Sequence, residues 1–188
     1  MRNLQEHILQ TASDLFYRHG VKATGIDTII KASGVAKMSL YKYFPSKEAL
    51  VLAYLQKTGA ALLRRLQQEL AQAAEPRQQL LAVFGMFAGI ANDPGFRGCP
   101  FINAVAEFGD QPNPAQQAAD EFYRQLLELL TGLAEQAGAR QPDLLARQLS
   151  LLIAGAMASK QFNIQAGAFP TALTAAESLI SVQLEPAA

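Results

Sequence analysis

The segment 34–44, GVAKMSLYKYF, holds two lysines, two tyrosines and a serine around three apolar anchors. Its first residue, Gly34, can take the positive φ that a sharp exit from a helix needs. Val35, Leu40 and Phe44 stand five and four residues apart, so they can hold one face of a short helix against its neighbours. The side chains left over carry ammonium and hydroxyl groups, which suit phosphates and base edges.

Two short helices joined at Ser33-Gly34-Val35 have the dimensions of a helix-turn-helix. Thr24 is the expected N-cap of the first helix of this pair. Lys37 opposes the dipole at the start of the second helix, but there its ammonium could reach guanine O6 and N7 in a major groove. The alternative is an ordinary solvated surface, because helical pairs with a glycine turn occur in many proteins.

The predicted DNA contacts divide by chemistry. The first turn of the second helix would read bases, the later residues would meet phosphate, and the helix N-termini near residues 24 and 47 would favour an anion. The predicted DNA-binding residues are Thr24, Gly25, Lys37, Met38, Ser39, Tyr41, Lys42, Tyr43 and Lys47.

The charge is unevenly distributed although its sum is zero. Residues 1–57 hold eight basic and four acidic residues, a net charge of +4, and the remainder has a net charge of −4. Lys160 is the only lysine after Lys57. This asymmetry favours a polyanionic partner for the first part, against the alternative of a chance excess on a solvated face.

Side chains for catalysis are sparse. The only histidines are His7 and His19, and the single cysteine is Cys99. The sequence has no His/Cys metal spacing, no G-x-S-x-G and no G-x-x-x-x-G-K, so we expect neither an enzyme nor a metal or cofactor. One cysteine, no apolar run of about 18 residues and no signal-peptide pattern favour a cytoplasmic location without a membrane span.

Helical periodicity runs through nearly the whole chain of 188 residues, so the predicted fold is all-α with about nine helices. Gly20 is expected to end the first helix, and Ser46 to cap a long fourth helix at about 47–73 that Pro76 terminates. Five further helices are predicted at about 77–91, 100–109, 115–138, 143–166 and 170–184.

The stretch ILQTASDLFYRHGVKATGIDTIIKASGVAKMSLYKYFPSKEALVLA resembles the N-terminal DNA-binding domain of the TetR family of bacterial transcriptional regulators. The resemblance covers about residues 5–55 and includes Phe16, Gly20, Thr24, Gly34-Val35 and the run from Leu40 to Leu50. It implies a homodimer with a helix-turn-helix domain at 1–46 and a ligand-binding and dimerisation domain at 47–188, connected by the fourth helix. It also implies that the positions of Thr24, Lys37, Met38, Ser39, Tyr41, Tyr43 and Lys47 face DNA.

The second part is expected to hold a small apolar or aromatic effector between packed helices. The alternative for each aromatic residue is plain core packing. The predicted ligand-binding residues are Phe84, Phe87, Cys99, Phe101, Asn103, Val105, Phe108, Phe122, Tyr123, Leu126, Met157 and Phe162, with Glu107, Arg124 and Gln161 as further polar candidates.

Three functional interpretations remain at this stage. The leading one is a ligand-responsive repressor that binds a palindromic operator as a homodimer. The last two helices of each copy would form the dimer interface. The alternatives are a DNA-binding regulator without a small-molecule inducer, and a thiol or redox sensor acting through Cys99, whose position before Pro100 at a helix start favours a thiolate. A buried, inert thiol is the simpler interpretation of Cys99.

Overall fold

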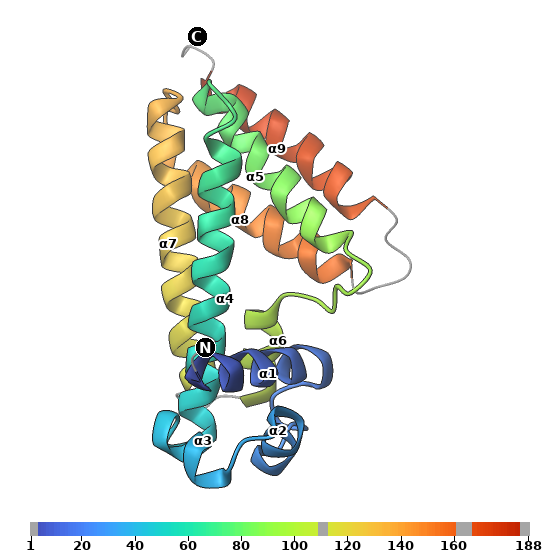
Figure 1. The fold of residues 1–188 in the computed structure, drawn as a ribbon. Helices are drawn as coiled ribbons and strands as arrows, with labels where there is room; N and C mark the ends of the chain where they lie inside the picture. The colour runs from blue at the N-terminus through green and yellow to red at the C-terminus, as the bar shows by residue number, and fades with distance from the viewer. Residues whose placement is uncertain (1–3, 109–112, 161–166, 185–188) are drawn as a thin grey trace. The chain divides into compact units, whose positions relative to one another are not determined.

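The computed structural model describes residues 4–108, 113–160 and 167–184, and those residues are organised as helices without a strand (Figure 1). This confirms the all-α prediction. The helices are α1 (Leu4–His19), α2 (Ile26–Ser33), α3 (Lys37–Tyr43), α4 (Lys47–Leu70), α5 (Pro76–Ala91), α6 (Pro100–Phe108), α7 (Pro114–Gln136), α8 (Pro142–Ser159) and α9 (Ala168–Leu184). In this described part, no helix combines the length and apolar character that a membrane crossing needs.

Two glycines end the first two helices as the sequence predicts. Gly20 has φ 89° and donates its N–H to the Phe16 carbonyl, and Gly34 has φ 69° and donates to the Ile30 carbonyl. A residue with a Cβ is disfavoured in this left-handed region, so glycine allows the chain to leave each helix sharply.

Three predicted boundaries are wrong. Thr24 is not the N-cap of α2, because Gly25 occupies that position without a side-chain cap. The fourth helix ends at Leu70, and Pro76 begins α5 instead of terminating α4. Proline fits a first helical turn, where its missing N–H has no partner to lose. The helix predicted at 143–166 ends at Ser159, and residues 161–166 lie outside the described part.

The chain divides into two compact units. Unit 1 comprises residues 1–61 and 99–122, and unit 2 comprises residues 62–98 and 123–188. Helices α4 and α7 therefore contribute residues to both units. This division places α6 and the start of α7 in the same unit as α1–α3, and the predicted domain boundary after residue 46 stays a prediction.

Unit 1 has an aromatic core. Phe16 of α1 meets Tyr54 of α4 with ring centroids 5.7 Å apart, and Phe101 stacks on Phe122 with centroids 4.4 Å apart and planes inclined by 6°. A Cβ at Gly59 of α4 would lie 3.3 Å from Phe122 Cδ2 and 3.4 Å from Phe101 Cζ. The absence of a side chain at position 59 thus leaves room for the stacked pair.

A carboxylate on α6 holds the turn between α1 and α2. Glu107 accepts hydrogen bonds from the backbone N–H groups of Val21, at 3.0 Å to Oε1, and of Lys22, to Oε2. Gly20 permits this approach, since a Cβ there would lie 2.9 Å from Glu107 Oε1. Charge-assisted bonds of this kind are about twice as strong as neutral ones. Glu107 is among the polar candidates predicted for an effector pocket, and no residue near it in the sequence signals this contact.

Unit 2 is built on the pairing of α8 with α9, against which α5 packs (Figure 1). Leu145, Leu149 and Ile153 of α8 and Ala176 and Ile180 of α9 are buried. At one end the Arg140 N–H donates to the Gln183 carbonyl, which joins the segment before α8 to the end of α9.

The Gly59→Ala variant tests the packing beneath the aromatic pair. Alanine gains about 1 kcal/mol of helix propensity over glycine. Overpacking of a filled core costs about 1–3 kcal/mol, and Phe101 and Phe122 are both buried. The matched control is Gly132→Ala in α7, where a Cβ meets no atom within 4 Å. In urea denaturation, Gly59→Ala should be about 1–3 kcal/mol less stable than this control; equal stabilities would show that the pair yields freely.

The Glu107→Gln variant tests the carboxylate at the turn. The amide keeps one acceptor but directs an NH₂ group at a backbone donor, so unfolding should become easier by about 1–3 kcal/mol. Hydrogen exchange measured by NMR should accelerate at the Val21 and Lys22 amides. The control is Glu177→Gln on the exposed surface of α9, with an expected change within about 0.5 kcal/mol. Unchanged exchange at Val21 and Lys22 would contradict the assigned role.

Candidate nucleic-acid interface and effector pocket

Helices α2 and α3 form the predicted helix-turn-helix within unit 1. Leu40 is fully buried, Phe44 is 4% exposed and Val35 is half-buried, so the three predicted anchors do hold α3 in the unit. The Phe44 N–H donates to the Leu40 carbonyl, which closes the last turn of α3. The predicted separation of α3 into a buried face and an outward face is confirmed.

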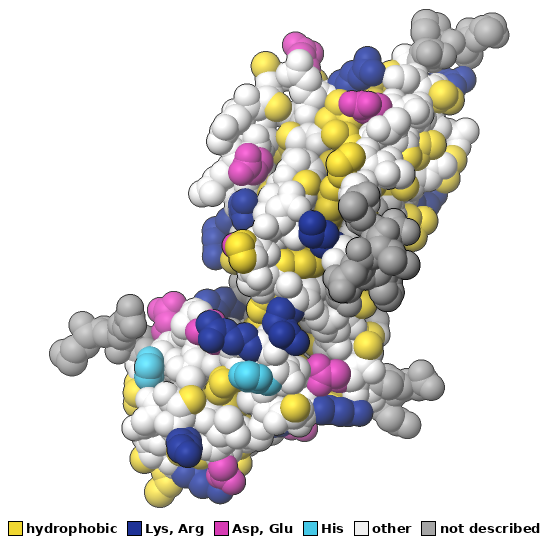
Figure 2. Space-filling model, turned by 90° about the vertical axis from the view of Figure 1, so that its right-hand side faces the viewer, with side chains coloured by type: hydrophobic (Ala, Val, Ile, Leu, Met, Phe, Trp, Pro, Cys, Tyr) yellow, Lys and Arg dark blue, Asp and Glu magenta, His cyan; other side chains and the backbone are white. Residues whose placement is uncertain are grey.

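The outward face of α3 carries an unusual apolar side chain. Met38 is 87% exposed and Tyr41 is 41% exposed, while Lys37 and Lys42 are also exposed. Ser39 and Tyr43 are half-buried. The region of α2 and α3 presents yellow, dark-blue and magenta side chains together in Figure 2. An exposed methionine beside ammonium groups suits a partner with both apolar and anionic atoms, as a base edge and its phosphate offer.

Lys37 already has a partner within the helix pair. Its Nζ lies 3.4 Å from Oδ1 of Asp27 in α2, and both side chains remain largely exposed. Exposed ion pairs of this type contribute little to stability. The ion pair therefore orients the Lys37 ammonium but holds it only weakly, and an acceptor on a partner can replace the Asp27 carboxylate. The sequence placed Asp27 in the first turn of α2 but gave no signal of this pairing across the turn.

Thr24 faces inward. It is 2% exposed, and its Oγ1 donates to the Gly20 carbonyl at 2.7 Å. Its hydroxyl therefore stabilises the α1–α2 turn, and this position does not support the prediction of a side-chain contact to DNA. Gly25 is exposed at the N-cap of α2, where no side chain occupies the helix N-terminus. The backbone N–H groups after Gly25 are the more suitable anion donors.

Lys47 stands at the start of α4. Its Nζ donates to the Lys22 carbonyl at 3.4 Å, and Ser46 Oγ accepts from the Ala49 N–H at 3.1 Å, which confirms the predicted cap. A backbone N–H bond and the Ser46 hydroxyl hold the pKa of Glu48 below its usual value. Lys47 thus joins the α4 N-terminus to the same turn that Glu107 holds.

The tyrosines of the basic part do not share one role. Tyr54 is 4% exposed, and burial raises the pKa of its phenol, with smaller contributions from Tyr17, Cys99 and Glu107. The Tyr54 phenol is therefore neutral at neutral pH and is part of the core of unit 1. On α3, Tyr41 is exposed and Tyr43 is half-buried, so both can contact a partner.

The predicted effector pocket is divided between the two compact units. Cys99, Phe101, Asn103, Val105, Phe108 and Phe122 belong to unit 1, and Phe84, Phe87, Tyr123, Leu126 and Met157 belong to unit 2. Phe162 and Gln161 lie outside the described residues. The stack of Phe101 on Phe122 is core packing, and a cavity of about 360 Å³ in unit 2 includes only Phe84 from the predicted set. The predicted pocket therefore stays a prediction.

Cys99 is a buried thiol immediately before α6, and its carbonyl accepts from the Asn103 N–H at 3.0 Å. In the part of the chain that the structure describes, no cluster of three or more His, Cys, Asp or Glu side chains could hold a metal ion.

Comparison with known proteins places both parts of the chain in one family. The family model described as "Bacterial regulatory proteins, tetR family" matches residues 8–54. A second, described as "Tetracyclin repressor-like, C-terminal domain", matches residues 76–178.

Individual relatives agree with the family models. The chain is 32% identical over 134 residues to the transcriptional repressor NemR of Escherichia coli strain K12, covering 70% of this chain and 67% of NemR. It is 41% identical over 73 residues to the uncharacterized regulator YxaF of Bacillus subtilis, a match that spans only 38% of YxaF.

Solved structures extend the likeness to nearly the whole chain. SCO4454, a TetR-family transcriptional regulator from Streptomyces coelicolor, superposes with a TM-score of 0.89 and 30% identity, covering 97% of this chain and 96% of SCO4454. Reduced NemR from E. coli gives a TM-score of 0.83 and 27% identity, covering 93% and 95% of the two chains. The chain belongs to the TetR family of bacterial transcriptional regulators.

Proposed function

We propose that this protein is a cytoplasmic repressor that binds a palindromic operator as a homodimer and is released by a small apolar or aromatic effector. The observation that carries the DNA-binding part is the outward face of α3, where Lys37, Met38 and Tyr41 are exposed on a helix anchored by buried Leu40. Family membership supports the same function. The relative NemR is described as a transcriptional repressor, which supports repression over activation for this chain.

The division of labour on this surface follows from position. Lys37 and Met38 begin α3, so they would enter the major groove and read bases. Lys47, Lys42 and the N–H groups at the start of α2 would hold phosphates and set the register. The Glu107 carboxylate would keep the α1–α2 turn, and hence the Lys22 carbonyl that Lys47 contacts, in the binding arrangement.

The dimer is proposed to form through α8 and α9. Leu151 of α8 is 72% exposed and Val182 of α9 is 56% exposed, so each of the two helices presents an apolar side chain that a second copy can cover. A pair of helices from each copy can form a two-fold four-helix interface. Such a dimer would place two copies of α3 on the two halves of a palindrome.

Release by an effector requires that the ligand bind one arrangement of the dimer more tightly than the other. Helix α4 is the proposed coupling element, since it begins beside the Lys22 carbonyl and continues into unit 2. A DNA affinity that no small molecule shifts would favour the alternative of a regulator without an inducer.

The first prediction separates base reading from phosphate binding. Lys37→Ala should change which sequence is preferred, with a loss of about 1–3 kcal/mol confined to one base position. Lys47→Ala should weaken binding to all sequences and reduce the slope of log K against log salt by about 1. Fluorescence anisotropy on operators obtained by in-vitro selection, repeated at several salt concentrations, measures both effects.

The control for both variants is Lys57→Ala. Lys57 donates to Gln10 Oε1 at 2.9 Å and lies 3.8 Å from Glu6 Oε1, away from the α2–α3 face, so its loss should leave DNA affinity and the salt slope nearly unchanged. If Lys37→Ala and Lys47→Ala had the same effect on every sequence, the proposed division would be wrong.

A second prediction concerns assembly. Wild-type protein should sediment as a dimer, and Leu151→Glu should sediment as a monomer, because a buried unpaired carboxylate opposes association. Met38→Glu is the control: it also adds a carboxylate at an exposed apolar position, but it should remain dimeric and lose DNA binding. A Leu151→Glu dimer as stable as the wild type would place the interface elsewhere.

A further inference from the structure

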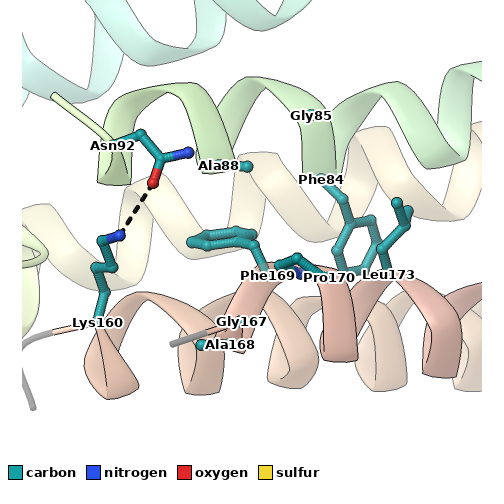
Figure 3. A pocket seen from close by; sticks show the side chains of 10 residues that line it. All are labelled: Phe84, Gly85, Ala88, Asn92, Lys160, Gly167, Ala168, Phe169, Pro170 and Leu173. Carbon is teal, nitrogen blue, oxygen red and sulfur yellow. Dashed lines mark hydrogen bonds between the residues drawn. The ribbon is translucent and has the colours of Figure 1, made fainter. Parts of the chain in front are cut away.

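Unit 2 contains a half-open cavity of about 360 Å³ between α5 and α9, which shares only Phe84 with the predicted effector pocket (Figure 3). Its volume is within the range of small-molecule sites. Phe84 and Phe169 form a buried floor, and Ala88, Pro170 and Leu173 continue the apolar wall. The cavity therefore offers an apolar surface that a hydrocarbon or aromatic group can cover.

One end of this cavity is polar. Lys160, which follows α8, donates from Nζ to Asn92 Oδ1 at 3.0 Å, and both side chains line the cavity. Because the amide oxygen accepts this bond, the amide nitrogen of Asn92 remains as a second donor, and Figure 3 shows it directed toward the side of Ala88. No hydrogen bond between described residues uses that nitrogen. Two donors thus lie together at the end of an apolar cavity.

The ammonium of Lys160 has no anionic partner within the described residues. Ion pairs within the described residues join Lys37 to Asp27, Lys57 to Glu6 and Arg124 to Glu128, and none of these pairs includes Lys160. The position of Lys160 just beyond Ser159 also suits the negative end of the α8 dipole. That purely structural role explains a cation at a helix end, but it does not explain an adjoining apolar cavity.

We propose that this cavity binds an amphipathic carboxylate, whose two oxygens meet the Lys160 ammonium and the Asn92 amide N–H while its apolar tail covers Phe84 and Phe169. An ammonium and an amide donor match the two oxygens of one carboxylate. Removing the tail from water supplies the rest of the affinity. Its lining residues belong to unit 2 and include none of α2 or α3, so the test below does not require that the chain represses transcription.

The test is isothermal titration calorimetry of the full-length protein with octanoate, with octanol as the uncharged counterpart, in the absence of DNA. Octanoate should bind saturably at one site per chain, and octanol should bind more weakly. Lys160→Met should weaken octanoate binding about 10-fold to 100-fold, the range expected for one charge-assisted hydrogen bond. Lys160→Arg should retain most of the affinity, because it restores the charge and the donor.

A second pair of variants tests the apolar part. Gly85 is exposed and lines the cavity, and a Cβ there meets no atom within 4 Å, so the side chain of Gly85→Leu should narrow the cavity and weaken binding. The matched control is Gly132→Leu, also at a helical glycine with open space but outside the cavity lining, and it should leave binding unchanged. Lys160 and Gly85 are both exposed, so these variants should fold.

Several results would overturn the proposal. These are no saturable octanoate binding, octanol binding as tightly as octanoate, or an unchanged affinity in either Lys160→Met or Gly85→Leu. Equal losses in Gly85→Leu and Gly132→Leu would likewise place the ligand outside this cavity.

Discussion

The arrangement of unit 1 depends on one carboxylate that accepts two consecutive backbone N–H groups. Glu107 is 85 residues from Lys22 in sequence, yet its bonds fix the turn from which α2 departs. The N–H group of buried Val21 must find an acceptor, and a turn between helices offers few within its own backbone. A side chain from α6 provides them. This makes α6 a structural part of the unit that presents α3, although the chain between them contains α4 and α5.

Local signals were enough to predict most helices and the outward face of α3. Glycines at 20 and 34 and the spacing of Val35, Leu40 and Phe44 act within a few residues, so they can be interpreted without tertiary knowledge. Contacts distant in sequence could not be predicted. Nothing near Glu107 indicates its partners at 21 and 22, and the pairing of Lys37 with Asp27 depends on the angle between two helices.

Thr24 and the aromatic residues show a second limit. A threonine before an Ile-rich helix is typical of an N-cap, but here the hydroxyl satisfies the Gly20 carbonyl instead. Likewise, phenylalanines at helical spacing do not reveal whether they enclose a ligand or each other, because both arrangements demand apolar side chains. Phe101 and Phe122 stack on each other. The residue types predict that the space between helices is lined by apolar side chains, whereas the packing of those side chains decides whether a cavity remains.

The contact between Lys37 and Asp27 has a consequence for discrimination between DNA sequences. If α3 binds DNA as proposed, Lys37 must leave a carboxylate at 3.4 Å, and that carboxylate is then exposed to the negative field of the duplex. If a single phosphate takes the place of the Asp27 carboxylate, Lys37 exchanges one anionic partner for another and the binding free energy changes little. A guanine edge offers two acceptors to the same ammonium, and these contacts offset the loss of the ion pair with Asp27. Asp27 can thus lower the affinity for non-specific DNA and leave the affinity for the operator nearly unchanged.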